Sequence, residues 1–183
     1  MLNQSLPIPH TEDLQHLFSQ FLEHHYKPLE VLSAKVGGAL ESFDFSNVPL
    51  EIAGYGQACH QLIQELNQYF RLHRLVLVPY INDLVEKEDN GHDCRNCSNG
   101  CAVKHASQVL NIRDAHDRLE KALAAEAAAS VTLNNAGVLS DPFLLLHQDI
   151  KTMVTETSEM IFLEKSVLIP MVLDLQRKIG VHA

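Results

Sequence analysis

The chain has 183 residues, of which 46% are hydrophobic and 20% charged, a composition typical of one soluble globular domain. Its formal net charge of −9 argues against a nucleic-acid or anionic-membrane surface, because both partners attract basic patches. The sequence predicts no membrane span and no export signal. Four cysteines, three of them crowded together, indicate reduced thiols, so we expect a cytoplasmic protein.

The first half of the chain predicts two helices after a proline-marked lead-in over residues 1–10. One begins near Thr11 and carries apolar residues at a spacing of three or four through Val36, with His25 inside that stripe. Pro28 should kink this helix near His25, and residues 37–49 should end it. The other runs from about 49 to 87 and places Tyr69 and His73 one turn apart on its inward face. Pro79 should distort this second helix without ending it.

The second half predicts two further helices after a polar loop over residues 88–101. The third helix extends from about 102 to 129, and residues 131–140 are predicted to be a loop. Ser140, Asp141 and Pro142 should start the last helix, which turns Met160, Glu164, Val167 and Met171 inward and ends near Gly180. Four helices over residues 11–179 predict an all-α fold, a single antiparallel four-helix bundle.

The chain contains an internal repeat with an offset of 91 residues. Residues 72–84 and 163–175 share six of thirteen positions, including Pro79 with Pro170. The same offset pairs His25 with His116, and His73 with Glu164 (116 − 25 = 164 − 73 = 91). The bundle should therefore consist of two duplicated helix hairpins.

Each predicted helix carries one polar residue with metal-binding ability in the middle of its apolar stripe. These residues are His25, His73, His116 and Glu164. Burying such groups is costly unless a partner is supplied, and a metal ion held between facing helices is a known bundle solution. The alternative is that each histidine bonds to a neighbour in the core and that the glutamate reaches a helix edge.

These motifs resemble the hemerythrin-like HHE cation-binding family, most closely its branch linked to repair of nitric-oxide-damaged iron–sulfur centres. The resemblance is carried by Val-Leu-Val-Pro79, Val-Leu-Ile-Pro170, Ala115-His116-Asp117, Glu164 and His25. It implies a four-helix bundle with a two-iron centre in its interior and a small diatomic ligand, and for this chain we expect one or two iron ions. In three places this chain departs from the family pattern. Tyr69 and Met160 stand where the family has histidines, and His73 stands where it has a bridging glutamate.

Three histidines and one carboxylate would also suit a single Fe(II) or Zn(II) ion. Tyr69 could add a phenolate and Met160 a thioether, while Glu65 and Glu156, one turn earlier, could supply carboxylates in a shifted site. The bulky Tyr69 and Met160 could instead fill the space of an absent second metal.

The loop between the halves offers a second candidate site. Cys94, Cys97 and Cys101, with His92 before them and His105 one turn after, could form a zinc site or a redox-reactive thiol group. The alternative is a solvated loop of reduced thiols.

The sequence shows no nucleophile–base pair and no phosphate-binding loop, so enzymatic turnover is not supported. We therefore expect a protein for iron handling or for sensing oxygen, nitric oxide or redox state. Two alternatives remain open. One is a metal-free bundle serving as an interaction or regulatory module, as a homodimer or with a protein partner. The other is a zinc or thiol sensor based on the cysteine loop.

Overall fold

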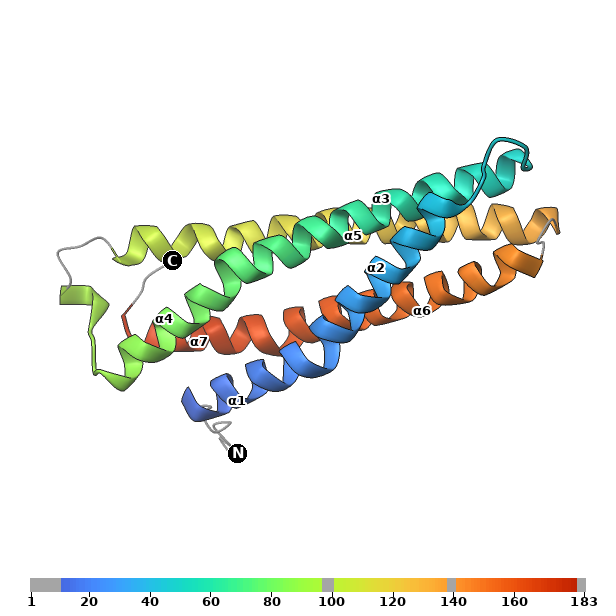
Figure 1. Ribbon diagram of the computed structural model, residues 1–183. Coiled ribbons are helices and arrows are strands. Elements are labelled where there is room, and N and C mark those ends of the chain that lie inside the picture. Colours follow the sequence, from blue (N-terminus) through green and yellow to red (C-terminus); the bar gives the residue numbers. More distant parts are fainter. Residues whose placement is uncertain (1–10, 97–100, 138–140, 181–183) are drawn as a thin grey trace, which may run out of the picture.

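The computed structural model describes residues 11–96, 101–137 and 141–180, and within these ranges it is a bundle of four long helices (Figure 1). The all-α bundle predicted from the sequence is confirmed. Three of the long helices are built from segments. The first comprises α1 (Thr11–Phe21), η1 (Leu22–Tyr26) and α2 (Lys27–Ser42). The second comprises α3 (Leu50–Leu72), η2 (His73–Leu77) and α4 (Val78–Asp89). The fourth comprises α6 (Asp141–Leu163), η4 (Glu164–Leu168) and α7 (Ile169–Lys178).

The third long helix, α5 (Cys101–Ala136), is uninterrupted, and a short 3-10 turn, η3 (Cys94–Asn96), precedes it. The predicted loop over 131–140 is wrong in its first part, because α5 continues to Ala136. Leu133 is fully buried there, and its packing favours another turn of helix. Gly137 then stops the helix with a φ of 64°, a left-handed conformation that glycine adopts without steric cost.

Three segments of the described helices are π-helical: η1, η2 and η4. Their backbone bonds span five residues, from Lys27 N–H to Leu22 O, from Val78 N–H to His73 O and from Ile169 N–H to Glu164 O. Each segment begins six residues before a proline (28 − 22 = 79 − 73 = 170 − 164 = 6). Proline lacks an N–H and its ring pushes away the carbonyl four residues earlier, so a wider turn accommodates it without ending the helix.

Each π turn moves the inward face of its helix by one residue. In the first helix the buried positions run from Phe21 to Tyr26, a step of five, so Tyr26 faces the core where His25 was predicted to lie. In the fourth helix Leu168 is buried, whereas Val167, predicted to face inward, is 38% exposed. The predicted stripe was wrong at these positions because it assumed an uninterrupted α-helical period.

The long helices pair along their lengths. α3 lies beside α5, α2 against α6 and α4 against α7, while α1 contacts both α4 and α7 (Figure 1). The 91-residue repeat appears directly in the backbone, since η2 and η4 occupy equivalent positions (164 − 73 = 91). The equivalent of Pro28 is Leu119, and α5 accordingly has no π turn there (28 + 91 = 119). Among the described residues, no helix is long and apolar enough to cross a membrane.

Two glycine substitutions should change stability in opposite directions. Gly180 follows α7 with a φ of 77°, and an added Cβ would lie 2.6 Å from Arg95 Cγ and 2.8 Å from Asp93 Oδ1. Gly180→Ala should therefore lower the free energy of unfolding by about 1–3 kcal/mol. Gly38 lies inside α2, and a Cβ added to it would meet no atom within 4 Å, so Gly38→Ala should raise the free energy of unfolding by roughly 0.5–1 kcal/mol. Urea unfolding of both variants measures the difference, and equal effects would contradict the role of Gly180.

Candidate metal centre

A buried polar cluster lies in the bundle interior where the four long helices meet. Tyr26 comes from η1, Tyr69 from the end of α3, His73 from the start of η2, His116 from α5 and Glu164 from the start of η4. Each of these side chains is at most 5% exposed, and Glu164 is completely buried. Two of the five residues open a π turn and a third closes one, so the prolines that impose those turns also position the cluster.

Glu164 is the centre of the hydrogen-bonding pattern. The hydroxyl of Tyr26 donates to its Oε1 and the hydroxyl of Tyr69 donates to its Oε2. His116 Nε2 lies 2.5 Å from the same Oε2. The two phenol oxygens are 3.0 Å apart, and Tyr69 Oη lies 3.2 Å from His116 Nε2. Donors from three other helices therefore converge on one carboxylate.

The cluster contains more polar contacts than hydrogen atoms that could be donated in them. Five contacts join Tyr26, Tyr69, His116 Nε2 and Glu164, and each phenol carries one hydrogen. His116 Nε2 and the Glu164 carboxyl group carry at most one hydrogen each. At most four hydrogens serve five contacts, so at least one contact brings lone pairs together without a hydrogen of its own. Such an arrangement of oxygen and nitrogen lone pairs suits a cation.

The electrostatic environment keeps both phenols protonated in the absence of a cation. Burial raises the pKa of Tyr26 well above its usual value, and the charge of Glu164 raises it further. Burial and Glu164 also raise the pKa of Tyr69. A phenolate beside a buried carboxylate is unfavourable because two like charges would lie in a medium of low dielectric constant.

His73 lies at the edge of the cluster with an unused ring nitrogen. Its ring packs on Tyr26 with centroids 3.6 Å apart and on Phe18 at 5.8 Å. Burial lowers its pKa to about 4, so the imidazole is neutral at physiological pH. Its Nε2 is buried and has no hydrogen-bond partner among the residues that the structure describes. A neutral imidazole with a free nitrogen is the form that binds metals.

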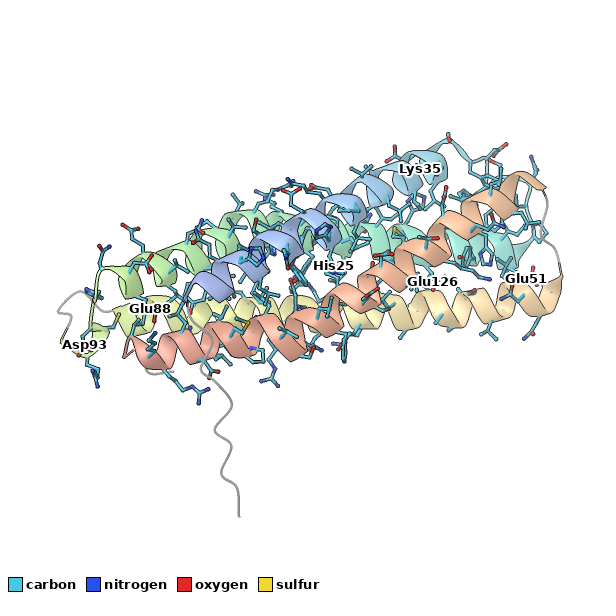
Figure 2. All side chains as sticks on the ribbon, turned by 90° about the horizontal axis from the view of Figure 1, so that it is seen from below. His25, Lys35, Glu51, Glu88, Asp93 and Glu126 are labelled. Atoms are coloured by element: carbon cyan, nitrogen blue, oxygen red, sulfur yellow. The ribbon has the colours of Figure 1, made fainter. Side chains whose placement is uncertain are left out.

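His25, the predicted ligand of the first helix, lies outside the cluster. It is partly buried, its ring packs on Phe21 at 5.2 Å, and it lines a small apolar pocket of about 180 Å³ with Leu163 and Leu168. Figure 2 shows it on the first helix, near the middle of the bundle. Sequence reasoning missed Tyr26, and the available signal was its place two residues before Pro28, in the strained part of that helix.

The structure brings together some of the other predicted ligands and separates the rest. His116 and Glu164 are in contact, with His73 nearby. Tyr69, weighed as an added ligand, is central to the cluster. Met160 is buried in the core as an apolar side chain. Glu65 forms an ion pair with the exposed Arg118 at 3.1 Å, and Glu156 is partly buried outside the contacts of the cluster.

Within the described residues, no group of three or more histidine, cysteine, aspartate or glutamate side chains is placed to hold a metal ion. The predicted set of His25, His73, His116 and Glu164 does not converge by itself. The convergence depends on the two tyrosines, which supply the third and fourth donors around His116 and Glu164.

The predicted loop site is only partly within the described residues. Cys94 is buried, and its N–H donates to the carbonyl of Ile179 at 2.8 Å, which ties the loop to the end of α7. His92 is partly buried. Cys97 and the side chains of Cys101 and His105 lie outside the described part, so zinc binding or thiol chemistry in this loop stays a prediction.

A second buried polar group occupies the other half of the bundle, and sequence reasoning attached no role to it. Tyr55 and Cys59 come from α3, Glu126 from α5 and His147 from α6, and all are at most 4% exposed. The hydroxyl of Tyr55 lies 2.8 Å from His147 Nδ1. Burial raises the pKa values of Tyr55 and Glu126 and lowers that of His147, so each favours its neutral form. Figure 2 shows Glu126 between His25 and the bundle end that carries Glu51.

Comparisons with known proteins give no relative for this chain, because no family model, curated protein or solved structure matches it. The chemistry of the centre is therefore argued from its residues alone.

The register shift in the first helix can be tested by stability. Tyr26→Phe removes a donor to the buried Glu164 and should lower the free energy of unfolding by about 1–3 kcal/mol. His25→Leu should be neutral or stabilising, because His25 Nδ1 is buried without a partner among the described residues. Both variants are measured in metal-free protein by urea unfolding. A large loss from His25→Leu with none from Tyr26→Phe would contradict the observed register.

The second polar group predicts an unreactive thiol. Cys59 is fully buried, and burial raises the pKa of its thiol to about 12. Because the thiolate is the reactive form, Cys59 should not be alkylated in native protein at neutral pH and should react fully in denaturant. Mass spectrometry of iodoacetamide-treated peptides measures this, and rapid native labelling of Cys59 would contradict the burial.

Proposed function

We propose that the protein is a hemerythrin-like bundle that holds one ferric ion in its interior and acts in iron handling or redox sensing. The proposed ligands are Tyr26, Tyr69, His116 and Glu164, with His73 beside them. The observation that carries the proposal is the hydrogen deficit of the cluster, in which five contacts share at most four hydrogens.

The charges of the donors favour a trivalent ion. Two phenolates and one carboxylate carry three negative charges, which a ferric ion balances. A divalent ion would leave either a net negative charge or a protonated phenol inside the bundle. An uncompensated buried charge costs several kcal/mol, so the neutral combination is strongly preferred. The raised pKa values of Tyr26 and Tyr69 mean that the phenols lose their hydrogens only when a cation takes their place.

The residues do not fit the two-iron centre that the family resemblance implies. Glu164 is the one carboxylate in the cluster, and its two oxygens already face different donors. Met160 occupies a position where the family has a histidine, and His25 lines a separate pocket. The space between the helices is taken by two tyrosine rings, which lie 6.2 Å apart by centroid.

The burial of the cluster favours a tightly held ion rather than one that takes part in a catalytic reaction. The cluster is buried, so water is largely excluded and the electrostatic attraction between ion and ligands is strong. A bound ferric ion would supply one-electron redox chemistry and the colour of phenolate coordination. Hard anionic oxygens bind Fe(II) less well than Fe(III), so reduction should weaken binding, and the four long helices would lose their shared partner. Release on reduction fits both iron handling and redox sensing.

The experiment is metal analysis and absorption spectroscopy of protein purified without chelator. We expect about one iron per chain and a visible phenolate-to-iron band, with stabilisation of the fold by mass action, about 2.7 kcal/mol at a free concentration a hundred times the Kd. Tyr69→Phe should abolish most of the band and lower the iron content. Tyr55→Phe is the matched control, because it removes a buried hydroxyl in the other half of the bundle and should leave the band unchanged.

A metal-free bundle gives the opposite pattern. Glu164 already has three protein donors, so a hydrogen-bonded core that serves an interaction module is the competing explanation. In that case purified protein is colourless, added ferric iron produces no band, and His116→Leu lowers the melting temperature equally with and without added iron, because it removes a donor to the buried Glu164. This combination would overturn the ferric proposal.

A further inference from the structure

The proposed metal centre borders a surface pocket at His116. A pocket of about 450 Å³ lies between α5 and the η4–α7 helix, and the buried His116 forms part of its wall. Ile112, Ile169 and Leu173 make its apolar surface. Its remaining lining is charged, with Arg113 and Asp117 from α5 and Lys165 from η4.

The charged residues of this pocket are close neighbours, along the chain, of residues in the cluster. Lys165 follows Glu164 directly, Asp117 follows His116, and Arg113 lies one helical turn before His116. Any molecule seated between Arg113 and Lys165 therefore lies next to the imidazole that contacts Glu164.

The two cations are available to a ligand. Arg113 has no ion-pair partner among the described residues, and neither does Asp117. Lys165 pairs with Glu120 at 2.5 Å, but both groups are exposed, at 40% and 49%. A surface ion pair of this kind contributes ~0–1 kcal/mol, so an anionic ligand can displace Glu120 from Lys165. Two such cations are notable in a chain whose net charge is −9.

The chemistry of ferric iron specifies what should enter here. Free ferric ion hydrolyses and precipitates at neutral pH, so it reaches a protein as a complex with an oxygen-rich anion. Carboxylates match Arg113 and Lys165, because guanidinium and ammonium groups donate charge-assisted hydrogen bonds to them. Asp117 repels a carboxylate but accepts a hydrogen bond from a hydroxyl. A small molecule with carboxylates and a hydroxyl satisfies all three groups.

We infer that this pocket binds a small hydroxycarboxylate anion, the carrier from which the ferric ion passes to the cluster. The carrier role rests on the proposed ferric site, whereas the anion binding stands on the pocket itself. Arg113 and Lys165 hold the carboxylates, Asp117 accepts a hydrogen bond from the hydroxyl, and His116 is the cluster residue that contacts the incoming complex.

The first arm of the test uses metal-free protein and citrate in isothermal titration calorimetry. Citrate should bind at low ionic strength, and the double variant Arg113→Gln/Lys165→Gln should weaken binding at least tenfold. The control is Arg71→Gln/Lys35→Gln, which removes an exposed arginine on α3 and a lysine that, like Lys165, holds a surface ion pair, here with Asp149. Tricarballylate, which is citrate without the hydroxyl, should bind less tightly than citrate, and Asp117→Asn should reduce that preference.

The second arm follows iron transfer by the phenolate band. Ferric citrate should load the wild-type protein at least tenfold faster than the Arg113/Lys165 double variant, while loading from ferric acetohydroxamate, which carries no carboxylate, should be equal in both.

The outcomes test the anion-binding pocket and the ferric site independently of each other. No citrate binding, or binding that the double variant does not weaken, overturns the pocket even if iron loads normally. Citrate binding that depends on Arg113 and Lys165 supports the pocket, and if iron then binds from neither source, it is the ferric site that fails. Equal loading rates from ferric citrate in both proteins would overturn the carrier role.

Discussion

Prolines placed inside continuous helices are the constraint on which this structure depends. A proline in a helix interior removes one hydrogen bond and displaces a carbonyl, at a cost of about 3 kcal/mol in a regular α-helix. Here three helices absorb it by widening one turn six residues earlier. The wider turn rotates the rest of each helix relative to the part before it. His73 and Glu164 open two such turns and Tyr26 closes the third, so the polar cluster lies at the points where the helices change phase.

The cluster illustrates how a core can bury polar groups without losing stability. Glu164 is completely buried, and a lone carboxylate in that position would be strongly destabilising. Three donors from three other helices offset this cost, and they also fix how the helices sit against one another. Burial lowers the pKa of His73 to about 4, so above that pH its ring presents a neutral face to Tyr26. Tyr26 therefore contributes both to the ring packing with His73 and to the hydrogen bonding of Glu164.

Much of the fold followed from the sequence, and the errors have one cause. The four helices, the proline distortions and the inward positions of Tyr69, His73, His116 and Glu164 could all be predicted from apolar spacing and the 91-residue repeat. Apolar spacing assumes a constant period, and a π turn breaks it by one residue. A constant period therefore places His25 in the core instead of its neighbour Tyr26, and Val167 instead of Leu168. The available warning was the presence of Pro28, Pro79 and Pro170 inside predicted helices, because a proline in a helix interior disturbs the regular period.

The duplication bears on why we propose one ion rather than two. Two equal hairpins would bring two equal sets of ligands, as a symmetric pair of metals requires. In this chain the two copies have diverged at the candidate ligand positions. Tyr69 is equivalent to Met160, and His73 is equivalent to Glu164. One half supplies a phenol and an imidazole, and the other supplies a carboxylate beside an apolar methionine that is fully buried. The first helix adds Tyr26 through its π turn, whereas its counterpart α5 has no proline and presents His116 from a regular helix. The repeat duplicates no donor of the cluster, because Tyr26 corresponds to Asp117, Tyr69 to Met160 and His116 to His25 (26 + 91 = 117, 69 + 91 = 160, 116 − 91 = 25). The chain therefore supplies one set of donors and leaves none for a second ion.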